Sequence, residues 1–292
     1  YHLAHVVDDS LMGVTHVFRG TEWIPTSPMH AFMFDALKLE RIQYVHLPLI
    51  LSPDGGKLSK RHGATSVKEF IKLGYTKEGL INYLSLLGWS LDDKTEDFTL
   101  ETLEKVFDPK RISKSSATFA YDKLNHFNSV YIKSYDDAKL FDLLTPYLIE
   151  LTGEDKFDSE KDKLKKIVAL YKDRLVTFSE ITDYLKFFYD DSMLTTDAQA
   201  YTFKKMTPEI VKQGLEIALS ISQEISEWDL DLFSEQVKIR TKDAGLKMHH
   251  VFMPLRMAVT GTAQTPSISD LVILLGKDKV VSRLKKAIDL LG

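Results

Sequence analysis

The feature that most constrains the fold is an apolar run that leads directly into a glycine-containing basic loop. Residues 45–51, VHLPLIL, predict a buried strand because apolar residues follow one another over a strand's usual length. The loop 53–63, PDGGKLSKRHG, comes next, and a helical pattern follows it over 65–73. A strand that leaves a sheet, enters a loop and continues as a helix is typical of open α/β folds, which bind ligands at the carboxyl ends of their strands. We therefore expect an α/β region with a ligand site at this loop.

The loop carries three cations, Lys57, Lys60 and Arg61, around Ser59. Flexible cations of this kind suit a polyanion, most plausibly the phosphates of a nucleotide. The loop is not a Walker A sequence, because Leu58 follows its Gly-Gly-Lys where Ser or Thr is required. A solvated surface loop is the alternative that the same residues allow.

The stretch 57–61, KLSKR, resembles the second signature of class I aminoacyl-tRNA synthetases, Lys-Met-Ser-Lys-Ser, and its continuation HGATSV resembles bacterial glutamyl-tRNA synthetases in particular. Three further stretches resemble the same family in the same order: YHLAHVVDD at 1–9, MGVTHVFRG at 12–20 and RMAVTGTAQ at 256–264. The resemblance covers most of the chain. The family's first signature, similar to His-Ile-Gly-His, is absent, so we expect the carboxyl-terminal part of a longer enzyme.

The resemblance implies an α/β remnant of a class I Rossmann-like catalytic domain followed by mainly α-helical domains. The expected divisions are the C-terminal half of the catalytic domain with the KLSKR loop at 1–64, a stem-contact helical domain at 65–134, and two helical anticodon-binding subdomains at 135–197 and 198–292. Helical anticodon domains favour the bacterial type, because those of eukaryotic and glutaminyl relatives are β-barrels.

Local patterns predict the elements within the α/β region. The β-branched runs 3–7 and 14–18 predict two strands, and a Ser-Pro pair starts a helix predicted over about 28–39. Because strand side chains alternate, His2 and His5 would lie on opposite faces, and we expect no metal site there.

Helical periodicity and capping residues predict most of the remaining elements. The predicted helices are 77–87, 100–107, 135–151, 163–170, 178–189, one that starts at Pro208, 230–244, one between Ser267 and Gly276, and 278–291. On the last of these, the cations Lys279, Arg283, Lys285 and Lys286 are expected opposite the apolar Val280, Leu284 and Ile288.

The resemblance also implies site residues. The expected glutamate-binding residues are Tyr1, His5 and Arg19, whose planar fork suits a carboxylate. The expected ATP-binding residues are Glu22, Ile50, Lys57, Leu58, Ser59, Lys60 and Arg61, with Lys60 and Lys57 as catalytic cations at the leaving pyrophosphate. The expected tRNA-binding residues are Trp23, Lys110, Arg111 and Lys114.

Residue types alone leave two of these assignments open. For Trp23, residue type by itself favours an ordinary core aromatic. The segment 110–133 holds five Lys or Arg against one acid, mixed with aromatics and hydroxyls, which suits an RNA backbone but fits an ordinary solvated face equally well.

The function that the resemblance implies is ATP-dependent ligation of L-glutamate to tRNA(Glu) through a glutamyl-adenylate, with Mg²⁺ accompanying ATP. As an isolated chain, we expect no adenylate formation, and the alternative is a tRNA-binding module without catalysis. The sequence does not decide whether the glutamine tRNA is also charged.

Composition limits the remaining classes. The chain has no cysteine, which excludes disulfides, a thiolate nucleophile and a Cys-built zinc site. It has neither a signal peptide nor an apolar run of about 18 residues, so we expect a cytoplasmic protein without membrane contact. We also expect a monomer. With a net charge of −4, RNA binding must rest on local basic patches.

Overall fold

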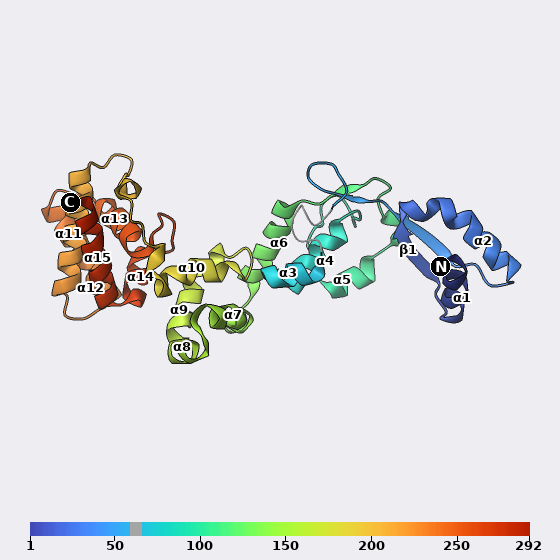
Figure 1. The fold of residues 1–292 in the computed structure, drawn as a ribbon, viewed down its shortest axis with the longest axis horizontal. Helices are drawn as coiled ribbons and strands as arrows, with labels where there is room; N and C mark the ends of the chain where they lie inside the picture. The colour runs from blue at the N-terminus through green and yellow to red at the C-terminus, as the bar shows by residue number, and fades with distance from the viewer. Residues whose placement is uncertain (59–65) are drawn as a thin grey trace. The chain divides into compact units, whose positions relative to one another are not determined.

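The computed structural model describes residues 1–58 and 66–292, and its contacts divide the chain into two units, Tyr1–Ser134 and Tyr135–Gly292 (Figure 1). Within the KLSKR loop, Ser59, Lys60 and Arg61 lie outside the described residues. The first unit combines short parallel strands with helices, and the second is helical. The predicted fold class, an α/β remnant followed by helical domains, is confirmed.

The first unit begins with a small α/β layer. Its elements are α1 (His2–Leu11), β1 (His16–Gly20), the 3-10 helix η1 (Thr21–Thr26), α2 (Ser27–Ala36) and β2 (Gln43–Leu47). Strands β1 and β2 pair in parallel, with Arg19 opposite His46. Helices α1 and α2 pack together and bury Val6 and Phe34 completely.

Two strand predictions in this layer need correction. The strand predicted at 3–7 is wrong, because this segment forms α1 and contacts α2, so tertiary packing overrides the β propensity of its valines. The strand predicted at 45–51 is divided. Strand β2 ends at Leu47, and β3 (Ile50–Leu51) follows Pro48, whose missing N–H cannot join a ladder.

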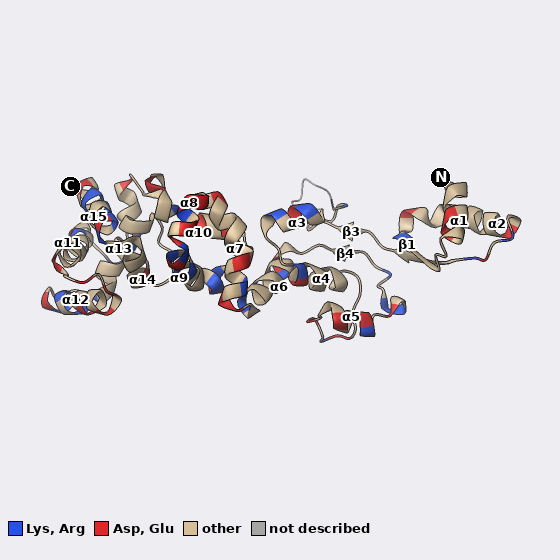
Figure 2. Cartoon of the chain, turned by 90° about the horizontal axis from the view of Figure 1, so that it is seen from below, with Lys and Arg blue, Asp and Glu red and all other residues tan. Residues whose placement is uncertain are grey.

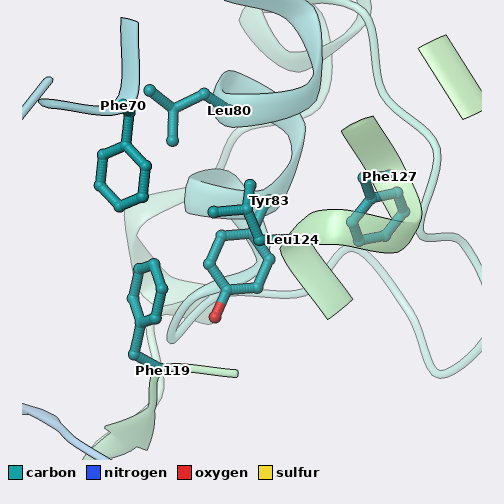
Figure 3. Packing of buried hydrophobic residues seen from close by; sticks show 6 residues of the cluster. All are labelled: Phe70, Leu80, Tyr83, Phe119, Leu124 and Phe127. Carbon is teal, nitrogen blue, oxygen red and sulfur yellow. The ribbon is translucent and has the colours of Figure 1, made fainter. Parts of the chain in front are cut away.

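The rest of the first unit is mainly helical. It contains α3 (Val67–Leu73), α4 (Lys77–Leu86), α5 (Leu100–Val106), η3 (Pro109–Arg111), β4 (Ala117–Thr118) and α6 (Tyr121–Ser134). Strand β4 pairs in parallel with β3, so this helical part is joined to the segment that carries the basic loop. Figure 3 shows one of its hydrophobic clusters, which contains Phe70, Leu80, Tyr83, Phe119, Leu124 and Phe127. A second cluster contains Trp89, Phe98 and Leu103.

Local hydrogen bonds explain where α3 and α4 begin. Ser66 and Glu69 form a capping box at α3, and Thr76 caps α4 by accepting from the Gly79 N–H. The buried Asn128 side chain of α6 accepts from both the N–H and the hydroxyl of Thr76, at 2.7 and 2.8 Å. A Cβ on Gly79 would lie only 2.9 Å from the Asn128 Oδ1, so this contact requires a glycine.

The second unit is built from helices and short 3-10 turns. In chain order these are α7 (Asp137–Thr152), α8 (Glu154–Ser159), α9 (Lys161–Tyr171), η4 (Lys172–Arg174), α10 (Glu180–Tyr189), η5 (Asp191–Met193), η6 (Ala198–Tyr201), α11 (Pro208–Glu224), α12 (Leu230–Asp243), α13 (Met248–Thr260), α14 (Ile268–Leu275) and α15 (Lys277–Leu291). Most predicted helices agree with these bounds within two residues, whereas α8 and α13 were not predicted. Helix α11 packs against α13 at Gly214, where a Cβ would lie 2.0 Å from the His250 carbonyl oxygen.

The basic face predicted on α15 is partly wrong. Arg283 is 1% exposed and donates hydrogen bonds to the carbonyls of Phe187 and Val259 and to Asp191. Lys279 donates to the Phe188 carbonyl at 2.6 Å. The last carbonyls of a helix have no partner within it, and here α15 supplies their donors from inside the unit.

Among the residues that the structure describes, every helix falls short of the length and apolarity needed to cross a bilayer.

Candidate substrate site and nucleic-acid interface

Arg19 is the centre of a polar site on the β1–β2 layer. Its Nε donates to the His46 Nε2 at 3.2 Å, its Nη2 donates to the Ser27 Oγ at 2.7 Å, and its Nη1 lies 3.1 Å from the His30 Nδ1. The guanidinium carbon is 4.1 Å from the centre of the Tyr44 ring. No carboxylate of the described residues forms an ion pair with Arg19.

Burial disfavours the charged forms of His30 and His46, the two histidines that contact Arg19. Desolvation lowers the pKa of His30 below its ordinary 6.5, and the nearby His5, Arg19 and His2 lower this pKa further. Desolvation and then Arg19 likewise lower the pKa of His46. The cation of Arg19 is therefore held by uncharged acceptors, and its own charge is not compensated by them.

The amino-terminal helix brings two further histidines to this site. In α1, His2 and His5 are three residues apart and lie on one face, contrary to the expectation from a strand. The His2 Nδ1 is 2.9 Å from the His30 Nε2, and the rings of His5 and His30 are 4.8 Å apart. Even so, no group of three or more His, Asp or Glu in the described ranges could hold a metal ion.

The predicted glutamate-binding residues meet in this site. The His5 Nε2 is 2.9 Å from the hydroxyl of Tyr44, which lies under Arg19, and the His5 Nδ1 is 2.8 Å from Asp9. The Tyr1 ring stacks on His5, with 6.1 Å between ring centres. Tyr1, His5 and Arg19 thus belong to one cluster.

Trp23 borders the same cluster. Its ring lies 5.2 Å from the Tyr1 ring and 6.5 Å from the His2 ring, and it is half-buried. It is therefore not the fully buried core aromatic that residue type alone favours. The neighbouring Glu22 folds back over Gly20, where a Cβ would collide with the carboxylate.

The residues predicted at the phosphate loop lie on a second framework. Ile50 accepts the Leu58 N–H at 3.2 Å, and Leu51 pairs with Lys57 in an antiparallel bridge. The buried Ser52 closes the turn by donating to the Gly56 carbonyl at 2.9 Å. Over the ranges that the structure covers, no hydrogen bond or ion pair links Lys57 to Arg19, and Ser59, Lys60 and Arg61 are outside these ranges.

The basic residues Lys110, Arg111 and Lys114 are exposed beside η3. Asp108 caps η3 by accepting from the Lys110 N–H at 2.9 Å, and the Trp89 indole donates to the Asp108 carbonyl at 3.1 Å. The buried Trp89 thus fixes a turn whose cations point to solvent. None of the three cations forms an ion pair with an acid of the described chain.

A second cationic cluster lies in the helical unit and was not predicted. The Arg174 Nη2 donates to the Thr265 carbonyl at 2.9 Å, and Arg256 follows the same loop with its Nη1 3.4 Å from the Ala263 carbonyl. Desolvation lowers the pKa of Arg256, and Arg174 lowers it further. The buried Nε of Arg256 has no partner in the described part of the chain.

Neither of these two arginines forms an ion pair with an acid of the described residues. The stretch RMAVTGTAQ at 256–264 gave a signal for Arg256, whereas Arg174 gave none, because it meets the loop only in the folded unit. Helices α9 and α15, labelled in Figure 2, are also rich in basic residues: α9 has four Lys and one Asp, and α15 has five Lys or Arg and two Asp.

Family comparisons agree with both halves of this arrangement. Residues 1–126 match the family model "tRNA synthetases class I (E and Q), catalytic domain", and residues 139–288, more than half of the chain, match the model "Anticodon binding domain". A catalytic segment of this kind followed by an anticodon-binding domain defines a class I aminoacyl-tRNA synthetase.

Similar proteins narrow the class. The glutamate–tRNA ligase of Treponema denticola is 38% identical and aligns with 99% of this chain and 61% of its own length. That of Borrelia duttonii is 41% identical and aligns with 100% of this chain and 58% of its own length. The solved structure of a glutamate tRNA ligase from Elizabethkingia meningosepticum in complex with its amino acid has a TM-score of 0.80 at 29% identity, and covers 100% of this chain and 60% of that one.

The chain belongs to the glutamate–tRNA ligase family. It spans about 60% of the length of the curated relatives it matches.

Proposed function

We propose that this chain works in an ATP-dependent glutamate–tRNA ligase. A carboxylate oxygen of L-glutamate attacks the α-phosphorus of ATP, and the bond to the leaving pyrophosphate breaks. A ribose hydroxyl of the terminal adenosine of tRNA(Glu) then takes the glutamyl group and AMP leaves. The observation that carries this proposal is the Arg19 site, in which a fixed guanidinium has only neutral partners among the described residues.

Arg19 selects the amino acid in this proposal. Arg19 is half-buried and its hydrogen-bond partners among the described residues are neutral, so a carboxylate that approaches its planar fork finds a cation without a counter-ion. The side-chain carboxylate of glutamate supplies that charge, and Tyr1 and His5 border it through their contacts with Tyr44 and with each other. The solved relative in complex with its amino acid supports a site of this kind.

The KLSKR loop handles the phosphates of ATP. Because the reaction needs no side-chain nucleophile, catalysis consists of positioning and charge stabilisation. Lys60, assisted by Lys57, stabilises the departing pyrophosphate. The other residues assigned to ATP are Glu22, Ile50, Leu58, Ser59 and Arg61. Magnesium would accompany ATP and would neutralise charge on its phosphates.

The tRNA contacts both units. Trp23, at the edge of the Arg19 cluster, meets the terminal adenosine by stacking, and Lys110, Arg111 and Lys114 neutralise phosphates of the stem. In the helical unit, Arg174 and Arg256 meet the unpaired anticodon bases. Their guanidinium groups and the neighbouring ring of Tyr184, which is half-buried and stacks on the buried Tyr171, suit single-stranded RNA.

A second candidate function applies to these 292 residues by themselves. The match to the anticodon-binding domain lies entirely within them, whereas they span only about 60% of the relatives' length. On this alternative the isolated chain binds tRNA and forms no adenylate. We further propose that the ligase is monomeric and acts in the cytoplasm, where its tRNA substrate is found.

Two assays on the same preparations test the proposal. Glutamate-dependent exchange of pyrophosphate into ATP reports adenylate formation, and filter binding of tRNA(Glu) titrated against salt reports the nucleic-acid interface. We expect both activities in the full-length protein, and binding without exchange in the 292-residue chain. Exchange by the full-length protein with another amino acid but not with glutamate would overturn the assignment.

A further inference from the structure

We propose that His30 is a positioning residue for glutamate recognition: by accepting from Arg19 and donating to His2, it fixes where the guanidinium points. The inference rests on the proposed function, because it assigns Arg19 to the substrate carboxylate. His30 does not reach the reacting atoms in this proposal and acts only through Arg19. Residue-by-residue resemblance gave no role to His30.

The hydrogen-bond partners fix the tautomers of this chain of groups. A guanidinium can only donate, so the Nδ1 of His30, 3.1 Å from the Arg19 Nη1, must be the acceptor. The proton of the neutral imidazole then sits on Nε2, which is 2.9 Å from the His2 Nδ1 and donates to it. In His30, Nδ1 therefore accepts from Arg19 and Nε2 donates to His2.

The same logic requires that His30 stay neutral. Its side chain is 0% exposed, and protonation would place an N–H on Nδ1 directly against the N–H of Arg19. The titratable and charged groups that face it are His2 and His5 from α1, Arg19 from β1 and Tyr44 from β2. None of these is an acid that would balance a second positive charge, and Asp9 pairs with His5 instead.

A purely structural role for His30 makes a different prediction from a positioning role. If His30 only fills the space between α1 and α2, any side chain of similar size should affect stability and leave substrate recognition unchanged. A pair of near-isosteric variants separates these roles. In H30N the amide oxygen occupies the place of Nδ1 and can still accept from Arg19. In H30Q the amide group occupies the place of Nε2, so the contact with His2 is kept and that with Arg19 is lost.

The test is pyrophosphate exchange by the full-length protein, with KM measured separately for L-glutamate and for ATP. We expect H30Q to raise the KM for glutamate about tenfold, which is typical for one hydrogen bond to a charged group, and to leave the KM for ATP within about twofold. We expect H30N to remain within about threefold of the wild type for both substrates. Melting curves of the two variants control for folding.

The experiment distinguishes failure of the proposed function from failure of the positioning role. If the wild type shows no glutamate-dependent exchange, the proposed function fails. If the wild type is active and H30Q has an unchanged KM for glutamate, or if H30N loses as much as H30Q, the positioning role is overturned.

Discussion

Replacement of Arg283 by Met should weaken the helical unit far more than its position on a charged helix suggests. The guanidinium donates to the main-chain carbonyls of Phe187 in α10 and Val259 in α13, and it pairs with Asp191 in η5 at 2.6 Å. These three acceptors lie on three different elements, and Arg283 joins them to α15. Methionine fills much of the same space but donates to none of them.

The loss can be estimated from the structure. An orphaned buried acceptor costs about 1–3 kcal/mol, and two carbonyls are left in this state. Removing one partner of a buried ion pair costs about 3–5 kcal/mol, but Asp191 is 45% exposed and still faces Lys286, so only part of this cost applies. The substitution also removes the buried Arg283 Nε, which has no hydrogen-bond partner among the described residues, and this offsets some of the loss. We expect a net destabilisation of about 3–5 kcal/mol.

Amide hydrogen exchange followed by mass spectrometry measures this loss in the intact chain. This method is chosen because a chain with two units need not unfold in a single transition. Peptides from α10, α13 and α15 that exchange by opening of the whole unit should exchange about 10² to 4 × 10³ times faster. Lys286→Met is the matched control. Lys286 faces the same Asp191 at 3.4 Å but is 63% exposed, so its loss should be below about 1 kcal/mol. Equal effects in the two variants would refute the reasoning.

Four further outcomes follow. In full-length protein, Lys60→Ala should slow pyrophosphate exchange about 10²–10³-fold, and near-wild-type exchange would rule out its role at the leaving group. Arg256→Gln should weaken tRNA(Glu) binding at least about tenfold in filter binding, whereas unchanged affinity would exclude an anticodon contact. Lys114→Ala should reduce the slope of log affinity against log salt by about 1, and an unaltered slope would remove it from the phosphate contacts. Because burial lowers the pKa values of His30 and His46, the unfolded chain binds more protons below pH 6.5. The first unit should therefore lose stability as the pH falls below 6.5, and exchange in α1 and α2 that is constant from pH 7 to about pH 5, after correction for intrinsic rates, would contradict this.

The sequence by itself determined features that depend on short stretches of chain. Helix starts at Thr76, Thr207 and Ser267 follow from a hydroxyl that caps the next turn, and the ends at Gly88 and Gly276 follow from backbones with positive φ. The KLSKR signature and its flanking stretches were also local, and they indicated the family that the comparisons confirm.

Only the tertiary structure decided how distant residues meet. The segment at 3–7 became a helix because α2 offers it a partner, and Arg283 became internal because α10 and α13 present unpaired carbonyls to it. Likewise, parallel pairing of β1 with β2 brings His46 to Arg19, and the packing of α1 on α2 brings His2 to His30. Periodicity and caps are encoded within a few residues, whereas the burial of a charge depends on which elements pack around it. For this reason the sequence predicted Arg19 as a binding residue, whereas only the fold shows that His46, Ser27 and His30 hold its side chain.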